Sequence, residues 1–136
     1  MEQQPSGEPN KLYQLRAEPK PDYLFVHVSG EADSLEVSTE FWREVRDLVR
    51  QHQTQKVLVQ ENFANTIDEV DVYTLNNRMA QMGFFNTRIA FVDEQQEQYE
   101  VNAFGASVGV NKGLLVRVFR TVPEAEQWLR SEIQDL

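Results

Sequence analysis

The hydrophobic pattern of this chain switches repeatedly between a period of two and a period of three to four residues. Residues 23–28 alternate with period two, which predicts a strand. Over residues 41–49 the apolar positions recur at helical spacing, and Asp33, Ser34 and Ser38 are candidate caps for this predicted helix. Short apolar runs at 57–59 and 89–92 predict two more strands.

The middle of the chain contains two further helical patterns. Val72, Leu75, Met79 and Met82 recur at spacings of three and four, after Asp68 as a candidate cap and before Gly83 as a left-handed terminator. A weaker pattern predicts a helix from about Gln95 to Val110. Its glycines, Gly105 and Gly109, would let this helix lie close to the sheet.

The last quarter of the chain gives the clearest signal. Residues 114–119 form a near-continuous apolar run, typical of a parallel strand covered on both faces. Thr121 can then cap a helix, with Pro123 in its first turn and Glu124 completing a capping box. The apolar face of this helix consists of Ala125, Trp128, Leu129 and Ile133. A strand that leads directly into such a helix indicates a layered α/β domain.

Together these segments predict the order β-β-α-β-α-β-α-β-α, with residues 12–15 as a short edge strand. Alternating strands and helices favour mostly parallel pairing. We therefore expect an α/β fold with a five-stranded mixed, mostly parallel sheet and helices on both faces. Residues 1–10 contain two prolines and no periodicity and predict a disordered lead-in, which leaves residues 11–136 as a single domain.

Composition narrows the function classes. The chain has 136 residues and no cysteine, which excludes disulfides, thiolate catalysis and cysteine-ligated zinc. Its 22 acidic and 13 basic residues give a net charge of -9, which argues against nucleic-acid binding. No apolar stretch approaches the roughly 20 residues needed to span a bilayer, and the first residues show no signal-peptide pattern. We expect a cytoplasmic protein without membrane insertion.

The chain resembles the SpoIIAA-like group of the STAS fold, most closely its small bacterial single-domain members of unknown function. The resemblance covers residues 12 to 133. Its residues are Asn111-Lys112-Gly113 leading into Val116-Arg117-Val118-Phe119, then Glu124-Ala125-Glu126-Gln127-Trp128-Leu129, with the strand and turn from Tyr23 to Gly30. These motifs are structural, so what they imply is the fold just described rather than an activity.

The resemblance also implies where a regulatory switch would lie. The best-understood members of the family are phosphorylated on a serine in Asp-Ser-Ser-Gly, at the start of the helix after the third strand. The matching residues here are Asp68-Glu69-Val70-Asp71, so Glu69 stands in the position of the phosphoserine. We therefore expect no phosphoacceptor serine. The carboxylate of Glu69 either mimics a permanently phosphorylated state or simply favours a helix N-terminus.

No catalytic, metal or cofactor site can be identified from the sequence. The two histidines, His27 and His52, have no ligand or triad partner at a useful spacing. The segment from Gly105 to Lys112 superficially resembles a phosphate loop, but its spacing is too short and its lysine comes too late. We expect a protein that is not an enzyme and has no cofactor.

Acidic residues are concentrated in one part of the chain. Between residues 61 and 100, eight acids and two bases give a charge of -6. Segments that follow parallel strands meet at one edge of the sheet, where ligands usually bind. The candidate partner-binding residues at this edge are Glu61, Asp68, Glu69, Asp93 and Glu94, with Glu31 and Asp33 nearby. They would suit a basic protein surface or a divalent cation, or they only favour helix starts and solubility.

An apolar cluster gives a second candidate site. Its members, at the end of the second predicted helix, are Met79, Met82, Phe84 and Phe85. They form either ordinary core packing or an adaptable wall for a lipid-like ligand. The sequence thus predicts a non-enzymatic regulatory or protein-interaction module with an unidentified protein partner. The alternative is a small-molecule or lipid carrier, and a homodimer stays open.

Overall fold

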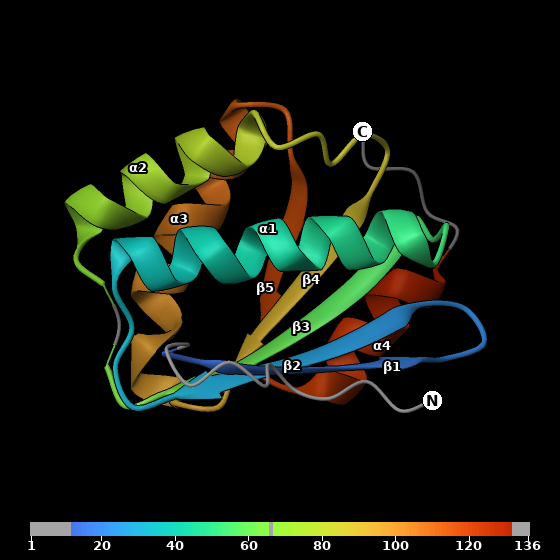
Figure 1. Cartoon of the computed structure of the whole chain (residues 1–136), viewed down its shortest axis with the longest axis horizontal. Helices are drawn as coiled ribbons and strands as arrows, with labels where there is room; N and C mark the ends of the chain where they lie inside the picture. Colours follow the sequence, from blue (N-terminus) through green and yellow to red (C-terminus); the bar gives the residue numbers. More distant parts are fainter. Residues whose placement is uncertain (1–11, 66, 132–136) are drawn as a thin grey trace.

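The computed structural model describes residues 12–65 and 67–131, and it contains five strands and four α-helices within them (Figure 1). The predicted lead-in at 1–10 and Ile133 lie outside the described residues. The strands are β1 (Gln14–Pro19), β2 (Leu24–Gly30), β3 (Lys56–Phe63), β4 (Arg88–Asp93) and β5 (Leu115–Phe119). The helices are α1 (Leu35–Gln51), α2 (Glu69–Ala80), the short 3-10 helix η1 (Gln96–Gln98), α3 (Tyr99–Asn111) and α4 (Val122–Arg130).

The sheet confirms the predicted fold class. Its strand order is β1-β2-β3-β4-β5, with β1 antiparallel to β2 and every other neighbouring pair parallel. Helical crossovers connect the parallel strands, so each helix begins near the carboxyl ends of the strands and ends near their amino ends. Because the helices share this direction, their free N–H groups and capping residues lie towards the carboxyl end of the sheet, and their free C=O groups lie towards the amino end.

Helices cover both faces of the sheet, but very unequally (Figure 1). The larger core lies under α1, α2 and α3, and it includes Phe41, Trp42 and Met79 together with the inward residues of β2, β3 and β4. The smaller core lies under α4 alone and is built around Leu58 and Leu129. Within the larger layer, α2 packs mainly on α1 and α3 rather than on the strands, so it lies at the outside of the molecule.

Predicted helix starts are largely correct. Asp68 caps α2 by accepting from Asp71 N at 2.9 Å, and Thr121 caps α4 by accepting from Glu124 N at 3.3 Å. Of the three candidate caps for α1, Ser34 takes the role, and its Oγ accepts from Val37 N at 3.1 Å. Asp33 is buried instead.

The expectation that the last strand is covered on both faces is wrong. β5 pairs only with β4 and forms one edge of the sheet. Leu115 is 41% exposed and Arg117 is also exposed, while Val116 packs in the larger core. The run is apolar because α3 covers one face of β5 and, on the other face, the ring of Phe119 packs against that of Trp128 at a tilt of 43°, with ring centroids 5.6 Å apart.

The two glycines of α3 do permit a close approach, but the main neighbour is α2. A Cβ on Gly105 would lie 2.6 Å from Val72 Cγ1, and a Cβ on Gly109 would lie 2.8 Å from Asn76 Oδ1. The sheet is the second neighbour, since the same Cβ on Gly109 would lie 3.3 Å from Val116 Cγ1. The glycines therefore lock α3 against both α2 and β5.

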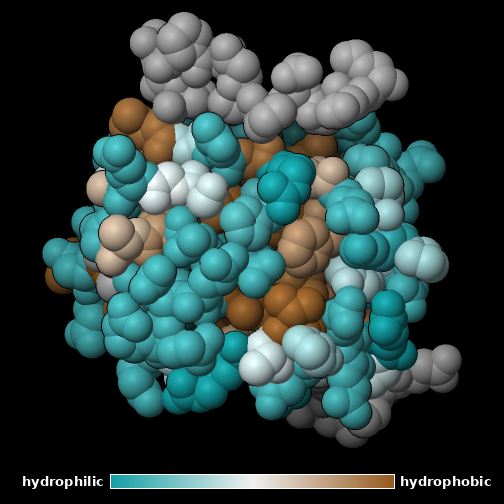
Figure 2. Space-filling view, turned by 90° about the horizontal axis from the view of Figure 1, so that it is seen from below, coloured by the Kyte–Doolittle hydropathy of each residue, from teal (hydrophilic) through white to brown (hydrophobic). Residues whose placement is uncertain are grey.

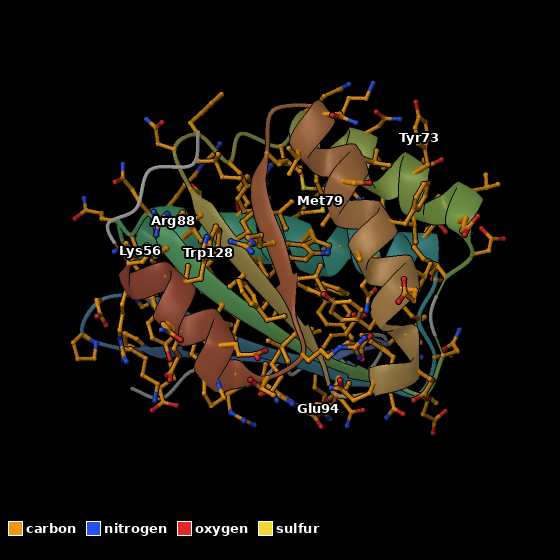
Figure 3. The ribbon with its side chains drawn as sticks, turned by 180° about the vertical axis from the view of Figure 1, so that it is seen from behind. Lys56, Tyr73, Met79, Arg88, Glu94 and Trp128 are labelled. Carbon is orange, nitrogen blue, oxygen red and sulfur yellow. The ribbon has the colours of Figure 1, made fainter. Side chains whose placement is uncertain are left out.

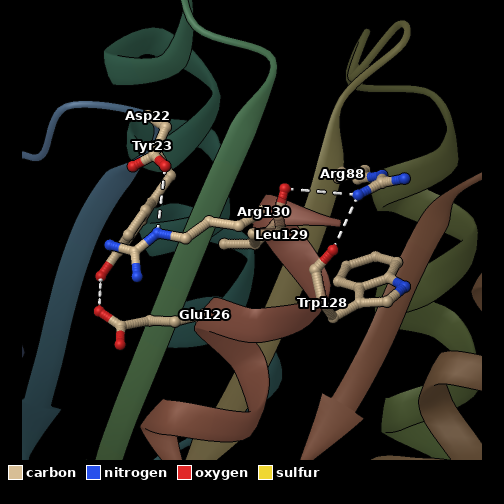
Figure 4. Close-up of polar contacts among 7 residues, drawn as sticks. All are labelled: Asp22, Tyr23, Arg88, Glu126, Trp128, Leu129 and Arg130. Carbon is tan, nitrogen blue, oxygen red and sulfur yellow. Dashed lines mark hydrogen bonds and ion pairs between the residues drawn. The ribbon is translucent and has the colours of Figure 1, made fainter. Parts of the chain in front are cut away.

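Polar contacts fix α4 on its face of the sheet (Figure 4). Tyr23 donates its hydroxyl hydrogen to Glu126, and Arg130 Nε lies 3.1 Å from Asp22 Oδ2. Arg88 Nη1 donates to the carbonyl oxygens of Trp128 at 2.8 Å and Leu129 at 3.4 Å, at the end of the helix. Burial and the hydrogen bond to Glu126 raise the pKa of Tyr23.

The outer surface is mostly hydrophilic on the side shown in Figure 2, with apolar side chains grouped near its centre. No helix within residues 12–65 and 67–131 has both the length and the apolar character needed to cross a membrane.

Candidate functional site

The structure separates the five predicted acidic residues into three different settings at the carboxyl end of the sheet. Glu61 and Asp93 are buried, with 6% and 4% exposure. Glu94 lies on the α4 side of the sheet, and Asp68 and Glu69 are exposed at the start of α2. The five residues therefore do not form one continuous surface.

Glu61 and Asp93 lie at the ends of neighbouring strands and face inward. They are directly opposite each other in the register of β3 and β4. Each continues the row of core residues on its strand, since Val59 precedes Glu61 and Phe91 precedes Asp93 on the same face. Burial under α1 and α3 therefore prevents either carboxylate from contacting a docked protein in this conformation.

A third buried acid, Asp33, completes this group. Its carboxylate accepts hydrogen bonds from Ser38 Oγ at 2.8 and 3.0 Å and from Ser34 N at 2.7 Å. Its backbone is tied to Asn65, whose Oδ1 accepts from Asp33 N at 2.8 Å. These bonds hold the segment between β2 and α1 against the segment after β3.

Burial raises the pKa of all three carboxyl groups. For Glu61 the pKa is raised well above the ordinary value, first by burial and then by the charges of Asp33 and Asp93. The pKa of Asp33 is also raised by burial, although hydrogen bonds from Ser38, Glu61 and the Ser34 backbone oppose this. The hydrogen bond between the two carboxyl groups raises the pKa of Glu61 and lowers that of Asp33, so it favours the proton on Glu61.

Asp93 stabilises the start of the α3 segment. Burial raises its pKa, while hydrogen bonds from Asn102 Nδ2 at 2.8 Å and Gln95 N at 2.9 Å oppose the rise. Across residues 12–65 and 67–131, no three or more His, Asp or Glu side chains are arranged to hold a metal ion. The buried acids thus link the segments that follow β2, β3 and β4, and their hydrogen bonds are made to the protein itself.

Glu94 is engaged on the opposite side of the sheet. Its Oε2 lies 2.9 Å from Nε2 of His27, which projects from β2 on the α4 side. Figure 3 shows Glu94 at the carboxyl end of the sheet, with Lys56 and Arg88 together at the other end. His27, which the sequence gave no role, is therefore the local partner of this acid.

Asp68 and Glu69 lie beside exposed apolar side chains. On α2, Val70 is 73% exposed and Tyr73, one turn later, is 47% exposed. Tyr73 projects from the outer side of α2 (Figure 3). We call Asp68, Glu69, Val70 and Tyr73 the acidic–apolar surface. Its position on the outermost helix leaves it open to a partner.

A small cavity lies between α1, α2, α3 and the sheet. Its volume is ≈ 60 Å³, and its walls include Asp33 and Glu61 among apolar side chains such as Phe41 and Met79. Cavities for drug-sized ligands are roughly 300–1,000 Å³. The described core is therefore nearly filled.

The predicted apolar wall is divided between two places. Met79 lines the cavity, and Met82 is buried in the same core. Phe84 is also buried in that core but lines a groove at the amino end of the sheet, and Phe85 is 81% exposed in this groove. The four residues do not share one ligand-facing surface.

The sequence pattern contains a signal for the burial of Glu61 but none for the exposure of Val70 and Tyr73. The alternation that places Val57, Val59 and Phe63 inward also places Glu61 inward, so its burial follows from the period of the strand. The exposure of Val70 and Tyr73 had no such signal, because α2 packs on two other helices and its buried side depends on them.

Comparisons with known proteins leave the family open. No protein-family model and no curated protein matches the chain. Among solved structures, the chain is similar to the NMR structure of the protein TM1081, with 17% sequence identity over 85% of this chain and 88% of that chain, and a TM-score of 0.49. The resemblance to the SpoIIAA-like group stays a prediction.

Proposed function

We propose that this protein is a non-enzymatic regulatory or interaction module that binds a basic partner through the acidic–apolar surface at the start of α2. One observation carries this proposal. Val70 and Tyr73 are 73% and 47% exposed on the outermost helix, directly beside the exposed carboxylates of Asp68 and Glu69. Apolar side chains exposed together within a charged rim are typical of protein-binding sites.

The two parts of the surface would act differently in binding. The carboxylates attract and orient a partner that carries lysine or arginine, which raises the association rate more than the affinity. Val70 and Tyr73 supply apolar contact, and tyrosine is among the residues that contribute most at interfaces. A partner with basic residues around one apolar side chain fits this arrangement.

The position of Glu69 supports the regulatory part of the proposal. In the resemblance described above, this residue stands where other proteins carry a phosphorylated serine. An exposed glutamate there gives a constant negative charge, although smaller than that of a phosphate. The partner would therefore bind without prior phosphorylation. The same carboxylate also interacts favourably with the α2 dipole, so its effect on binding must be measured apart from its effect on stability.

The carrier alternative receives no support from the cavity. With ≈ 60 Å³, the cavity beneath α3 has no room for a lipid chain, and opening it would separate helices that Gly105 and Gly109 hold in close contact. A filled core beside an exposed charged surface favours the interaction module over the carrier.

The experiment compares partner capture by three tagged proteins. The first is the natural chain, the second carries Glu69→Lys with Val70→Ser, and the third carries Glu124→Lys as a matched control. Glu124 is also an exposed acid in the first turn of a helix, but it lies on α4. Quantitative mass spectrometry of proteins captured from the source organism should show basic partners that the second protein loses and the third retains.

Binding of a defined partner then localises the contact. Nuclear magnetic resonance titration of the ¹⁵N-labelled chain with that partner should shift the amide signals of residues 68–73. Equal capture by all three proteins, at equal melting temperatures, would refute the proposal. So would shifts confined to a surface that excludes α2.

A further inference from the structure

A wide groove crosses the amino end of the sheet, opposite the acidic–apolar surface. Three separate segments line it, and they are the β1–β2 turn, the end of α1 with its connection to β3, and the loop between α2 and β4. Its volume is ≈ 760 Å³. None of the five predicted partner-binding acids lines it.

The charge of this groove differs in sign from that of the whole chain. Four bases line it, Lys20, Arg46, Arg50 and Lys56, against one acid, Asp22. The chain as a whole has 22 acids and 13 bases. The carboxylate of Asp22 is engaged by Arg130 at 3.1 Å. The groove is therefore a basic region on an acidic protein.

Local carboxylates neutralise only half of these bases. Glu18 lies 3.2 Å from Lys20 Nζ, and Asp47 lies 3.1 Å from Arg46 Nε. Within residues 12–65 and 67–131, neither Arg50 nor Lys56 forms an ion pair. These two residues supply the unneutralised positive charge of the groove.

The loop after α2 is shaped to hold the two arginines of α1 in place. The carbonyl oxygen of Met82 accepts from Arg46 Nη1 at 3.2 Å and from Arg50 Nη2 at 3.5 Å. Gly83, with φ +92°, follows directly, and a Cβ on it would lie 2.5 Å from Arg50 Nη2. A Cβ here would therefore make the end of the Arg50 side chain shift, and the positive φ also favours glycine. A guanidinium has five N–H donors, so Arg50 retains several for a ligand.

An exposed aromatic residue adds an apolar contact to the groove. Phe85 is 81% exposed, although its neighbours Phe84 and Thr87 are buried. The carbonyl oxygen of Phe85 accepts from Thr87 Oγ1 at 3.0 Å, which fixes the loop while the ring stays in solvent. A large apolar side chain held outside the core is available to a partner.

We propose that this groove binds an acidic peptide segment of another protein, with its carboxylates on Arg50 and Lys56 and an apolar side chain against Phe85. The bases lie on different segments of the wall rather than around one point, which suits several spaced carboxylates better than a single phosphate. The proposal goes beyond the basic partner of the acidic–apolar surface, because it assigns a second partner of opposite charge to the opposite end of the sheet.

The test uses a fluorescein-labelled peptide, Glu-Asp-Glu-Leu-Glu-Asp-Glu, and measures its fluorescence anisotropy with the full chain. We expect saturable binding that weakens with added salt, because exposed charges are screened. Lys56→Glu and Arg50→Glu should each weaken binding about tenfold or more, since like charges then face each other. Arg43→Glu is the matched control, because it makes the same change of charge on α1 outside the groove.

Melting temperatures of all variants separate loss of binding from loss of fold. If Arg50→Glu is unstable, Lys56→Glu alone tests the basic side chains. Phe85→Ser should weaken binding of this peptide but not of the version with serine in place of leucine. Three results would overturn the proposal. The first is that the Arg43→Glu and Lys56→Glu variants bind the peptide equally well. The second is that a single-stranded oligonucleotide binds the chain more tightly than the peptide does. The third is that the chain self-associates and that added peptide does not dissociate the complex.

Discussion

The two ends of the sheet carry opposite charge, and the direction of the helices accounts for much of this difference. At the carboxyl end, where helices begin, the first turns contain acids such as Glu36, Glu69 and Glu124. At the amino end, the last turns of α1 and α4 contain Arg50 and Arg130. Each charge lies at the helix terminus whose dipole it complements. Charge separation alone therefore does not indicate a binding site.

Exposure and shape distinguish the candidate sites from this background. At the carboxyl end, apolar side chains are exposed beside the acids on α2, whereas Glu61 and Asp93 are buried. At the amino end, Arg50 and Lys56 line a groove instead of a convex surface. A charge at a helix terminus becomes informative when something beyond the dipole, such as an exposed apolar residue or a concave surface, accompanies it.

The largest effect should come from exchanging a buried acid at the carboxyl end. Asp93→Lys places an ammonium group where Asp93 is 4% exposed and removes the acceptor for Asn102 and Gln95. We expect the free energy of unfolding to fall by at least about 3 kcal/mol. Glu69→Lys, at an exposed helix start, should cost no more than about 1 kcal/mol. Urea denaturation of both variants measures the difference, and equal losses would contradict the division into buried and exposed acids.

Two glycine substitutions should come next, one in the middle of α3 and one in the loop after α2. Gly105→Ala gains helix propensity of up to about 1 kcal/mol but forces its Cβ to within 2.6 Å of Val72, so we expect a net loss of about 1–2 kcal/mol. Gly83→Ala should cost about 1–2 kcal/mol because of its positive φ, and it should also displace Arg50. Thermal unfolding measures both losses. In the anisotropy assay only Gly83→Ala should weaken binding of the acidic peptide.

A smaller effect should appear as a pH dependence that belongs to the carboxyl end alone. The pKa of Glu61 is raised in the folded protein, so the folded state binds more protons than the unfolded state above the ordinary value of 4.5. The contribution of Glu61 to the free energy of unfolding is then fully present below pH 4.5. It is lost as the pH rises through the raised pKa of the folded protein. Glu61→Gln, which stays neutral and can still donate to Asp33, should flatten this fall.

Glu69→Gln is the control for that measurement, because it removes one acid from the exposed set and leaves the buried group intact. Denaturant midpoints between pH 4 and pH 8 give the slope for each protein. Parallel slopes for the natural chain and the Glu61→Gln variant would show that the buried carboxyls do not control the pH dependence.

The smallest effects on stability should come from the exposed apolar residues. Val70→Ser and Phe85→Ser should each change the free energy of unfolding by no more than about 0.5 kcal/mol, because both side chains are largely in solvent. Their effects on binding should nevertheless be specific. Val70→Ser should weaken only the binding of the basic partner, and Phe85→Ser should weaken only the binding of the acidic peptide. If either variant lost binding of both partners, the two ends of the sheet would act as one binding site and not as two.

The sequence by itself determined the fold class, because local patterns are sufficient for it. Period two at 23–28, helical spacing at 41–49, and caps such as Asp68 and Thr121 depend on neighbouring residues only. Alternation along β3 also contained the inward position of Glu61, since a strand that buries Val57 and Val59 buries every second residue after them.

Only the tertiary structure decided where β5 lies and which of the acids are accessible. An apolar run looks the same in a central strand as in an edge strand covered by α3, so the edge position of Leu115 had no local signal. Arg46, Arg50 and Lys56 line the same groove as Phe85 because the end of α1, the start of β3 and the loop before β4 converge at one end of the sheet. Such meetings between distant segments depend on packing, and no spacing along the chain encodes them.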